Sequence, residues 1–276
     1  MVEFFQALIN QSFLQHALLG GLLASLGCGI IGSYVVVNRI TFLAGGIAHT
    51  ALGGMGIAYY LGVDPIFGAL AAALTGALII GTVSLRWRQH EDTLIGALWA
   101  IGMAVGVVFI SRTPGYNADL MSYLFGNILM ISDGDLYLMA LLDGVILMLV
   151  TLFYKVFLAV SFDEEFARLR GLPVGFFYLL LLCMVALTVV LLIRVVGLIL
   201  VIALLTLPAA IAGQYLRSLW RMMVLATLLG VLFSSAGLAV SYGPDLPAGA
   251  TIIILAGSVY LISLAFGGFL RRRWMS

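Results

Sequence analysis

The chain contains nine apolar stretches, each long enough to cross a lipid bilayer or nearly so. A transmembrane helix needs about 20 predominantly apolar residues. Only 9% of the 276 residues are charged and 63% are hydrophobic, whereas a soluble domain carries about 25% charged residues. The pattern predicts an all-α, polytopic membrane protein with about eight to nine transmembrane helices. The predicted spans are residues 13–37, 42–62, 65–85, 93–111, 136–160, 174–193, 195–213, 221–241 and 248–270.

Basic residues fall mostly in alternate loops between these spans. Of the 13 Lys and Arg residues, only Arg112 and Arg194 lie on the opposite side. Because cytoplasmic loops are enriched in Lys and Arg, the N-terminus is predicted outside and the C-terminus inside. No polar stretch is long enough for a soluble domain, so residues 1–276 are expected to form a single transmembrane domain. No basic tract suggests that the protein binds nucleic acid.

His49 is the ionisable side chain in the middle of the apolar stretch Phe42–Asp64. Ten residues of helix separate it from Arg39, about 15 Å at 1.5 Å per residue. That is roughly half of a ~30 Å hydrocarbon core, which places His49 near the midplane. An ionisable residue at this depth is a functional-site hypothesis, and imidazole is a common metal ligand. A neutral histidine that bonds to a neighbouring helix is the alternative.

Small residues around His49 recur at helical spacing. One stripe shares the face of His49, and a second stripe runs beside it. Such stripes let another helix approach closely or leave room for a small solute. Further along, a proline inside the seventh span is expected to bend that helix, although a tolerated kink without function explains it equally well. The predicted packing and kink residues are Gly45, Gly46, Gly53, Gly54 and Pro208.

Asp143 is a second ionisable group inside a span. An unpaired carboxylate there costs about 2.5–3.5 kcal/mol on insertion scales, so it needs a cation, a partner or a proton. One interpretation makes it a second metal ligand or a residue of the transport pathway. The other makes it a protonated acid that bonds between helices.

Acidic residues gather on the predicted outer side. Solvated loop carboxylates explain most of them, whereas a vestibule that attracts cations is the functional interpretation. His16, near the outer end of the first span, is a candidate to join this group. The candidates for an outer cation vestibule or receptor contact are His16, Asp64, Asp119, Asp133, Asp135 and Asp245.

The outer connection, residues 111–135, is long and carries an apolar run that is too short to span the membrane. We expect the run, Leu120–Ile131, to form a short or re-entrant helix. Irregular backbone at membrane depth is tolerated only where protein or a water-filled cavity covers it. The segment is therefore a candidate gate or a docking surface for an external partner.

Several common enzyme motifs are absent from the sequence. It has no Gly-rich phosphate loop that ends in Lys-Ser/Thr, so the chain is not expected to hydrolyse ATP itself. It also lacks a His-Glu-x-x-His motif and a cysteine pair at zinc spacing. The two cysteines, Cys28 and Cys183, both lie in apolar runs and are interpreted as core residues.

The inner loop of residues 161–173 predicts a short helix. Acidic residues precede basic ones, which suits the helix dipole, and a glycine then a proline end the pattern. Such a helix on the cytoplasmic face is a natural docking element, and a solvated loop is the alternative. The candidate docking residues are Phe162, Asp163, Glu164, Glu165, Ala167, Arg168 and Gly171.

This loop resembles the cytoplasmic coupling motif of ABC importer permeases, through Glu165-Phe166-Ala167 and Gly171. The chain as a whole resembles the zinc/manganese class of ABC permeases, the ABC-3 type, which are type II-like importer permeases often drawn with eight spans. The blocks that carry the resemblance are GGIAHTALGG at 45–54, EDTLIGALWAIGMAVGV at 91–107, LFGNILMISDGDL at 124–136, FDEEFARLRGLP at 162–173, VVGLILVIALLTLPAAIA at 195–212 and DLPAGATIII at 245–254.

The resemblance implies a homodimeric permease in a prokaryotic plasma membrane. It implies a separate pair of ATP-hydrolysing subunits inside and a metal-binding receptor outside. The transported ion would be Zn²⁺ or Mn²⁺, taken up by alternating access, with no permanently bound cofactor. A secondary transporter driven by an ion gradient, or a membrane scaffold or intramembrane enzyme, is the alternative.

The resemblance also assigns His49 to the conserved membrane histidine of the family. Many members place an aspartate four residues earlier, where this chain has Gly45. Either His49 acts with another group such as Asp143, or the ion is held loosely, which suits conduction. Because imidazole suits zinc and carboxylate-rich sites suit manganese, the missing aspartate favours zinc first and manganese second.

Overall fold

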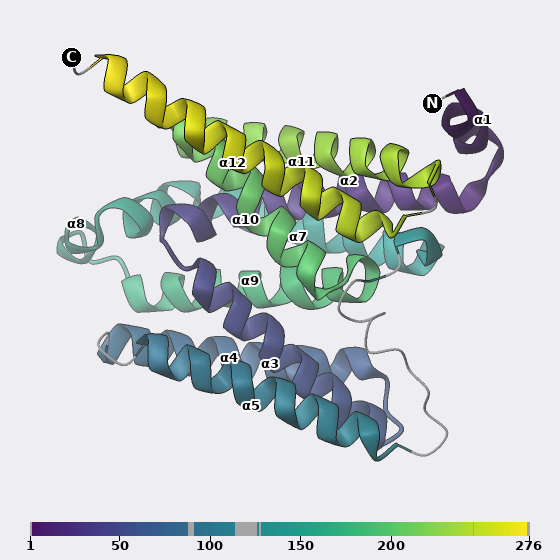
Figure 1. Cartoon of the computed structure of the whole chain (residues 1–276). Coiled ribbons are helices and arrows are strands. Elements are labelled where there is room, and N and C mark those ends of the chain that lie inside the picture. Colours follow the sequence, from purple (N-terminus) through teal and green to yellow (C-terminus); the bar gives the residue numbers. More distant parts are fainter. Residues whose placement is uncertain (1, 88–90, 114–125, 127, 245, 275–276) are drawn as a thin grey trace. The chain divides into compact units, whose positions relative to one another are not determined.

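The computed structural model describes residues 2–87, 91–113, 126, 128–244 and 246–274, and every regular element within these ranges is a helix (Figure 1). Nine of the described helices are long and apolar enough to cross a membrane. They are α2 (Ser12–Val37), α3 (Thr41–Tyr60), α4 (Pro65–Arg86), α5 (Glu91–Ser111), α7 (Asp133–Phe162), α9 (Val174–Val196), α10 (Leu198–Tyr215), α11 (Leu219–Tyr242) and α12 (Ala248–Trp274). The prediction of an all-α polytopic protein is thus confirmed, and the ninth predicted span is a helix of membrane-spanning length and composition among the described residues.

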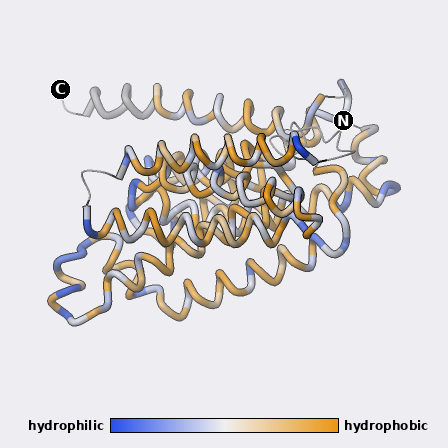
Figure 2. The backbone as a smooth tube through the Cα atoms, turned by 90° about the horizontal axis from the view of Figure 1, so that it is seen from below, coloured by the Kyte–Doolittle hydropathy of each residue, from blue (hydrophilic) through white to orange (hydrophobic). Residues whose placement is uncertain are grey.

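Three shorter helices complete the described chain: α1 (Val2–Asn10), the 3₁₀ helix η2 (Ile128–Met130) and α8 (Glu164–Leu169). The sequence predicted α8 but gave no sign of α1. Most of the predicted re-entrant run lies outside the described residues, and η2 is its described part. Figure 2 shows hydrophobic residues along the long helices and hydrophilic residues gathered near helix ends.

Two boundaries differ from the predicted ones for local reasons. Helix α7 begins at Asp133 rather than at residue 136 because Ser132 and Asp135 cap each other. The Asp135 N–H donates to Ser132 Oγ, and the Ser132 N–H donates to Asp135 Oδ2, each at 3.2 Å, the reciprocal pattern of a capping box. Helices α9 and α10 are separated at Gly197 rather than at Arg194. Gly197 has φ of 81°, a conformation that costs glycine little.

The chain divides into two compact units. Unit 1 contains residues 1–36, 121–143 and 195–276, and unit 2 contains residues 37–120 and 144–194. Helices α2, α7 and α9 therefore each contribute to both units. The expectation of a single domain over residues 1–276 stays a prediction.

Within unit 2, helix α3 packs against both α4 and α5, and the three lie side by side in Figure 1. Glycines allow this close approach. A Cβ atom built on Gly56 would lie 2.7 Å from the carbonyl oxygen of Gly106, closer than real side chains come. The hydrophobic effect does not hold helices together within a lipid bilayer, so their association depends on close van der Waals packing. Small residues permit that close packing.

Within unit 1, small residues of α2 face α10 and α11. A Cβ on Gly29 would lie 2.7 Å from backbone atoms of Thr227, and one on Gly32 would meet the backbone of Leu205. Helices α10, α11 and α12 also pack against one another. Helix α10 is assigned as one helix through Pro208, which is buried; the expected bend at this proline stays a prediction. Helix α7, in contrast, leaves helical geometry at Phe153, with φ −106° and ψ 16°.

Candidate functional site

His49 lies in the middle of α3 and stacks on Trp99 of α5. The two ring centroids are 4.1 Å apart and the ring planes differ by 18°. The residue is 7% exposed. Its Nδ1 atom has no hydrogen-bond partner among the described residues. A buried imidazole nitrogen without a partner costs free energy, so this atom is available to bind an ion or a proton.

The first stripe of small residues faces α5, and the second faces both α4 and α5. A Cβ on Gly45 would lie 3.1 Å from the Trp99 ring, and one on Gly53 would lie 2.7 Å from the Gly102 carbonyl oxygen, both in α5. In the second stripe, Gly54 meets the backbone of Gly68 in α4. A Cβ on Gly46 would lie 2.7 Å from the Ile95 side chain in α5. Both stripes therefore serve close helix packing, which fixes the position of His49.

Trp99 is the residue of this site that sequence reasoning missed. It covers both His49 and Gly45. An aspartate at position 45 would compete with the indole ring for space. The indole therefore occupies the region in which a carboxylate would otherwise lie. The sequence offered no direct signal, because a tryptophan in an apolar span is usually a packing residue.

Asp143 lies in α7 within unit 1 and is 5% exposed. Its Oδ2 atom has no hydrogen-bond partner among the described residues. A buried carboxylate oxygen without a partner is costly, which agrees with the expectation that Asp143 needs a cation, a partner or a proton. His49 belongs to unit 2.

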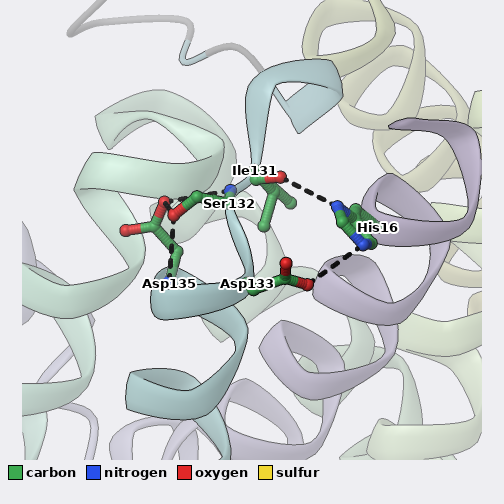
Figure 3. Close-up of polar contacts among 5 residues, drawn as sticks. All are labelled: His16, Ile131, Ser132, Asp133 and Asp135. Carbon is green, nitrogen blue, oxygen red and sulfur yellow. Dashed lines mark hydrogen bonds and ion pairs between the residues drawn. The ribbon is translucent and has the colours of Figure 1, made fainter. Parts of the chain in front are cut away.

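The predicted outer residues have different environments. Asp64 caps α4 by accepting a hydrogen bond of 3.0 Å from the Ile66 N–H, and Asp135 is engaged with Ser132 in the cap of α7. His16 of α2 contacts two groups at the start of α7: Nε2 lies 3.2 Å from Asp133 Oδ1, and Nδ1 lies 3.3 Å from the Ile131 carbonyl oxygen (Figure 3). The other two candidates, Asp119 and Asp245, lie outside the described residues.

The predicted docking helix forms as α8. The Asp163 carboxylate accepts a hydrogen bond of 2.9 Å from the Phe166 N–H and caps the helix. Arg168 forms an ion pair of 2.6 Å with Glu164 one turn earlier. Gly171 has φ of 74°, and its N–H donates to the Arg168 carbonyl oxygen at 2.9 Å. Such a left-handed residue is the usual end of a helix.

Helix α8 exposes apolar side chains beside a polar cavity. Ala167 is buried and anchors the helix, whereas Phe162, Phe166 and Leu169 are exposed. A cavity of about 490 Å³ lies next to it. The polar residues among those that line this cavity are Asn38, Arg39, Ser84, Asp92, Ser161, Glu164 and Tyr178. Exposed apolar side chains at a membrane protein's polar face are typical of a protein contact.

The described residues contain no group of three or more His, Cys, Asp or Glu side chains placed to hold a metal ion. His49, Asp143 and the His16–Asp133 pair are thus separate features rather than one preformed site among the residues that the structure describes.

Comparison with known proteins identifies the family. The model of the ABC 3 transport family matches residues 10–267. The chain belongs to the ABC 3 transport family. This finding confirms the resemblance to ABC-3-type permeases, and it supports a transport subunit rather than an enzyme.

Relatives within the ABC 3 family align over nearly the whole chain. An uncharacterised membrane protein of Synechocystis is 50% identical over 96% of this chain and 95% of its own. The manganese transport system membrane protein MntC of Halalkalibacterium halodurans is 34% identical over 98% of this chain and 94% of its own. Among solved structures, PsaBC from Streptococcus pneumoniae in complex with Fab has a TM-score of 0.86 and 33% identity, and the match covers 95% of each chain.

Proposed function

We propose that this chain is the membrane-spanning subunit of an ATP-driven importer for a divalent transition metal ion, working by alternating access. The observation that carries the proposal is the family match over residues 10–267. The buried, unpartnered Nδ1 of His49 in the middle of α3 supports it, because it supplies a metal ligand at membrane depth.

Manganese is the first cargo to test and zinc the second. The sequence-based preference for zinc rests on the imidazole of His49 and on the missing carboxylate at position 45. The name of a relative that aligns over 98% of this chain contains manganese. We give this second observation more weight, because it concerns the whole protein rather than one residue.

Each group of residues has a separate role in the proposed transport. The outer acidic residues attract the cation. His49 then holds it transiently near the midplane, and Asp143 is a further residue of the pathway that binds the ion or compensates its charge. Weak ligation suits the role, since an ion that is held too tightly does not leave. Trp99 stacks on the His49 ring and therefore leaves less room beside it for other groups that could bind the ion.

The partners follow from the family. Two copies of this chain form the pathway in a prokaryotic plasma membrane, an extracytoplasmic receptor delivers the ion, and a pair of ATP-binding subunits docks inside. The docking surface is Phe162–Gly171, because α8 is capped at both ends and exposes apolar side chains. No permanent cofactor is part of the proposal, and ATP is consumed by the partner.

The test is uptake of radioactive manganese and zinc into vesicles that contain the permease, its ATPase and its receptor. His49→Ala is expected to lower the initial rate by about tenfold or more, because even a second-shell partner of a metal ligand is worth 10- to 100-fold. Thr50→Ala is the matched control, since Thr50 lies next to His49 but bonds within its own helix, to the Gly46 carbonyl oxygen. Equal uptake by wild type and His49→Ala, with the assembly intact, would reject the midplane ligand.

The docking surface has its own test in Leu169→Asp. Leu169 is 88% exposed on α8, so a charge there leaves the fold of the permease unchanged. It is expected to reduce co-purification of the ATPase by about tenfold, the effect of roughly 1.4 kcal/mol of lost binding energy. Leu246→Asp, at another exposed leucine on the predicted outer side, is the control and should keep the complex. Loss of the complex in both variants, or in neither, would contradict the assignment of α8.

A further inference from the structure

His16 and Asp133 form a polar pair at the start of α7, within unit 1 (Figure 3). His16 comes from the second turn of α2, and Asp133 is the first residue of α7. The imidazole is partly covered, with 27% of its side chain exposed, whereas the carboxylate is 77% exposed. Asp135, two residues further along α7, accepts hydrogen bonds from Ser132 through its Oδ2 atom.

The contact with Ile131 favours one position of the imidazole proton. A carbonyl oxygen only accepts hydrogen bonds, so His16 Nδ1 must donate to the Ile131 oxygen, 3.3 Å away. In a neutral imidazole the other nitrogen, Nε2, then carries a lone pair. That lone pair lies 3.2 Å from Asp133 Oδ1, which is also an acceptor. Two acceptors at this distance are joined either by a proton, carried by His16 or by Asp133, or by a metal ion.

The distance fits a shared metal ion. Nitrogen and oxygen ligands lie about 2.0–2.2 Å from zinc, so two adjacent ligands of an octahedral or tetrahedral ion are about 3.0–3.4 Å apart. The observed 3.2 Å between His16 Nε2 and Asp133 Oδ1 lies in this range. A ligating histidine also commonly donates its other N–H to a backbone carbonyl, which fixes the ring, as His16 does to Ile131.

We propose that His16 Nε2 and the Asp133 carboxylate form a weak entry site for the transported divalent transition metal ion. The proposal rests on the proposed function, and it adds a defined pair of ligands to a diffuse acidic vestibule. Water fills the remaining coordination positions, since the exposed carboxylate leaves one side of the site open. Two protein ligands bind an ion briefly, which suits a site that passes its ion on.

The first test is a titration of the purified full chain with Mn²⁺, in which electron paramagnetic resonance measures free Mn²⁺. All variants are made in a His49→Ala background, so that the midplane ligand does not contribute. His16→Gln and Asp133→Asn are each expected to weaken Mn²⁺ binding by about tenfold or more. Asp133→Glu, which keeps the carboxylate, should retain part of the binding. Asp92→Asn, which removes an exposed carboxylate of α5 in unit 2, is the matched control and should bind as the background chain does.

The imidazolium alternative gives a different result. If a proton alone joins the pair, His16→Gln and Asp133→Asn will bind Mn²⁺ as the background chain does, and the proposal is overturned. Size-exclusion chromatography identifies any variant that has not folded. If Asp133→Asn has not folded, Asp133→Glu replaces it. Weaker Mn²⁺ binding than in the background chain then supports the shared metal ion, and equal binding overturns it.

The second test is uptake by the assembled importer with His49 restored. Loss of an entry ligand should raise KM for Mn²⁺ about three- to tenfold and leave kcat unchanged, because saturating ion compensates for weaker capture. Unchanged KM in both variants, with normal ATP-driven uptake, would overturn the entry site alone. Absence of ATP-driven uptake in the wild type would instead reject the proposed function.

Discussion

At position 45 a larger side chain would have to displace the Trp99 ring. A Cβ there lies 3.1 Å from the indole, and overpacking of this kind typically costs about 1–3 kcal/mol. We therefore expect Gly45→Asp alone to lower thermal stability and to reduce metal uptake. Differential scanning calorimetry of the detergent-purified chain measures the thermal stability, and vesicle uptake measures the transport of metal.

The double variant Gly45→Asp with Trp99→Ala tests the cause of that loss. Removing the indole gives space to the new carboxylate beside His49, so stability and uptake should recover relative to Gly45→Asp, and Mn²⁺ should bind more tightly than in wild type. Trp99→Ala alone is the control for loss of the aromatic contact, which is worth about 0.5–1.5 kcal/mol beyond its buried area. If Gly45→Asp proves as stable as wild type, Trp99 does not limit the site.

At this scale the sequence identifies residues whose chemistry is unusual for their surroundings. His49 and Asp143 are recognisable because ionisable groups in apolar spans are rare. Trp99 is not, because nothing in the sequence says which residue of α5 faces His49. The Ser132–Asp135 cap follows a known spacing of serine and an acidic residue, and reading it would have placed the start of α7 correctly. The His16–Ile131 contact joins residues 115 positions apart, which no local pattern reveals.

The contact between α3 and α5 depends on glycines that meet backbone atoms directly. Gly53→Ala would place a methyl group 2.7 Å from the Gly102 carbonyl oxygen, and backbone cannot move aside as a side chain can. We expect a loss of about 1–3 kcal/mol in the free energy of unfolding, seen as a lower denaturation temperature. Gly96→Ala in α5 is the matched control, because nothing lies within 4 Å of its built Cβ. It should be neutral or stabilising by about 0.4–1 kcal/mol. Equal stability of the two variants would contradict the tight contact.

Whole helices were the easiest elements to predict, because the bilayer fixes both their length and their polarity. All nine predicted spans correspond to described helices. Helix ends were harder, since they depend on single residues. The positive φ of Gly197 separates α9 from α10, and a hydropathy profile does not predict backbone dihedral angles. The short helix α1 was missed because nine residues give too little pattern.

For the molecule as a whole, an odd number of spans places the two termini on opposite sides of the membrane. The distribution of Lys and Arg predicts the N-terminus outside and the C-terminus inside. The test uses a chain in which both cysteines, Cys28 and Cys183, are replaced by alanine, so that a single introduced cysteine reports its own position. Gln6→Cys and Arg170→Cys report the N-terminal end and the loop after α8, both at exposed residues.

A membrane-impermeant maleimide is expected to label Gln6→Cys in intact cells and Arg170→Cys only after the cells are permeabilised. Ser276→Cys should behave as Arg170→Cys does, because the C-terminus follows the ninth span. Eight spans would place both termini on one side, so Gln6→Cys and Ser276→Cys would then label together. The reverse pattern, with Arg170→Cys labelled in intact cells, would move α8 away from the ATPase and put the His16–Asp133 pair at the exit rather than the entry. The orientation of this chain therefore decides the direction in which each of its sites acts.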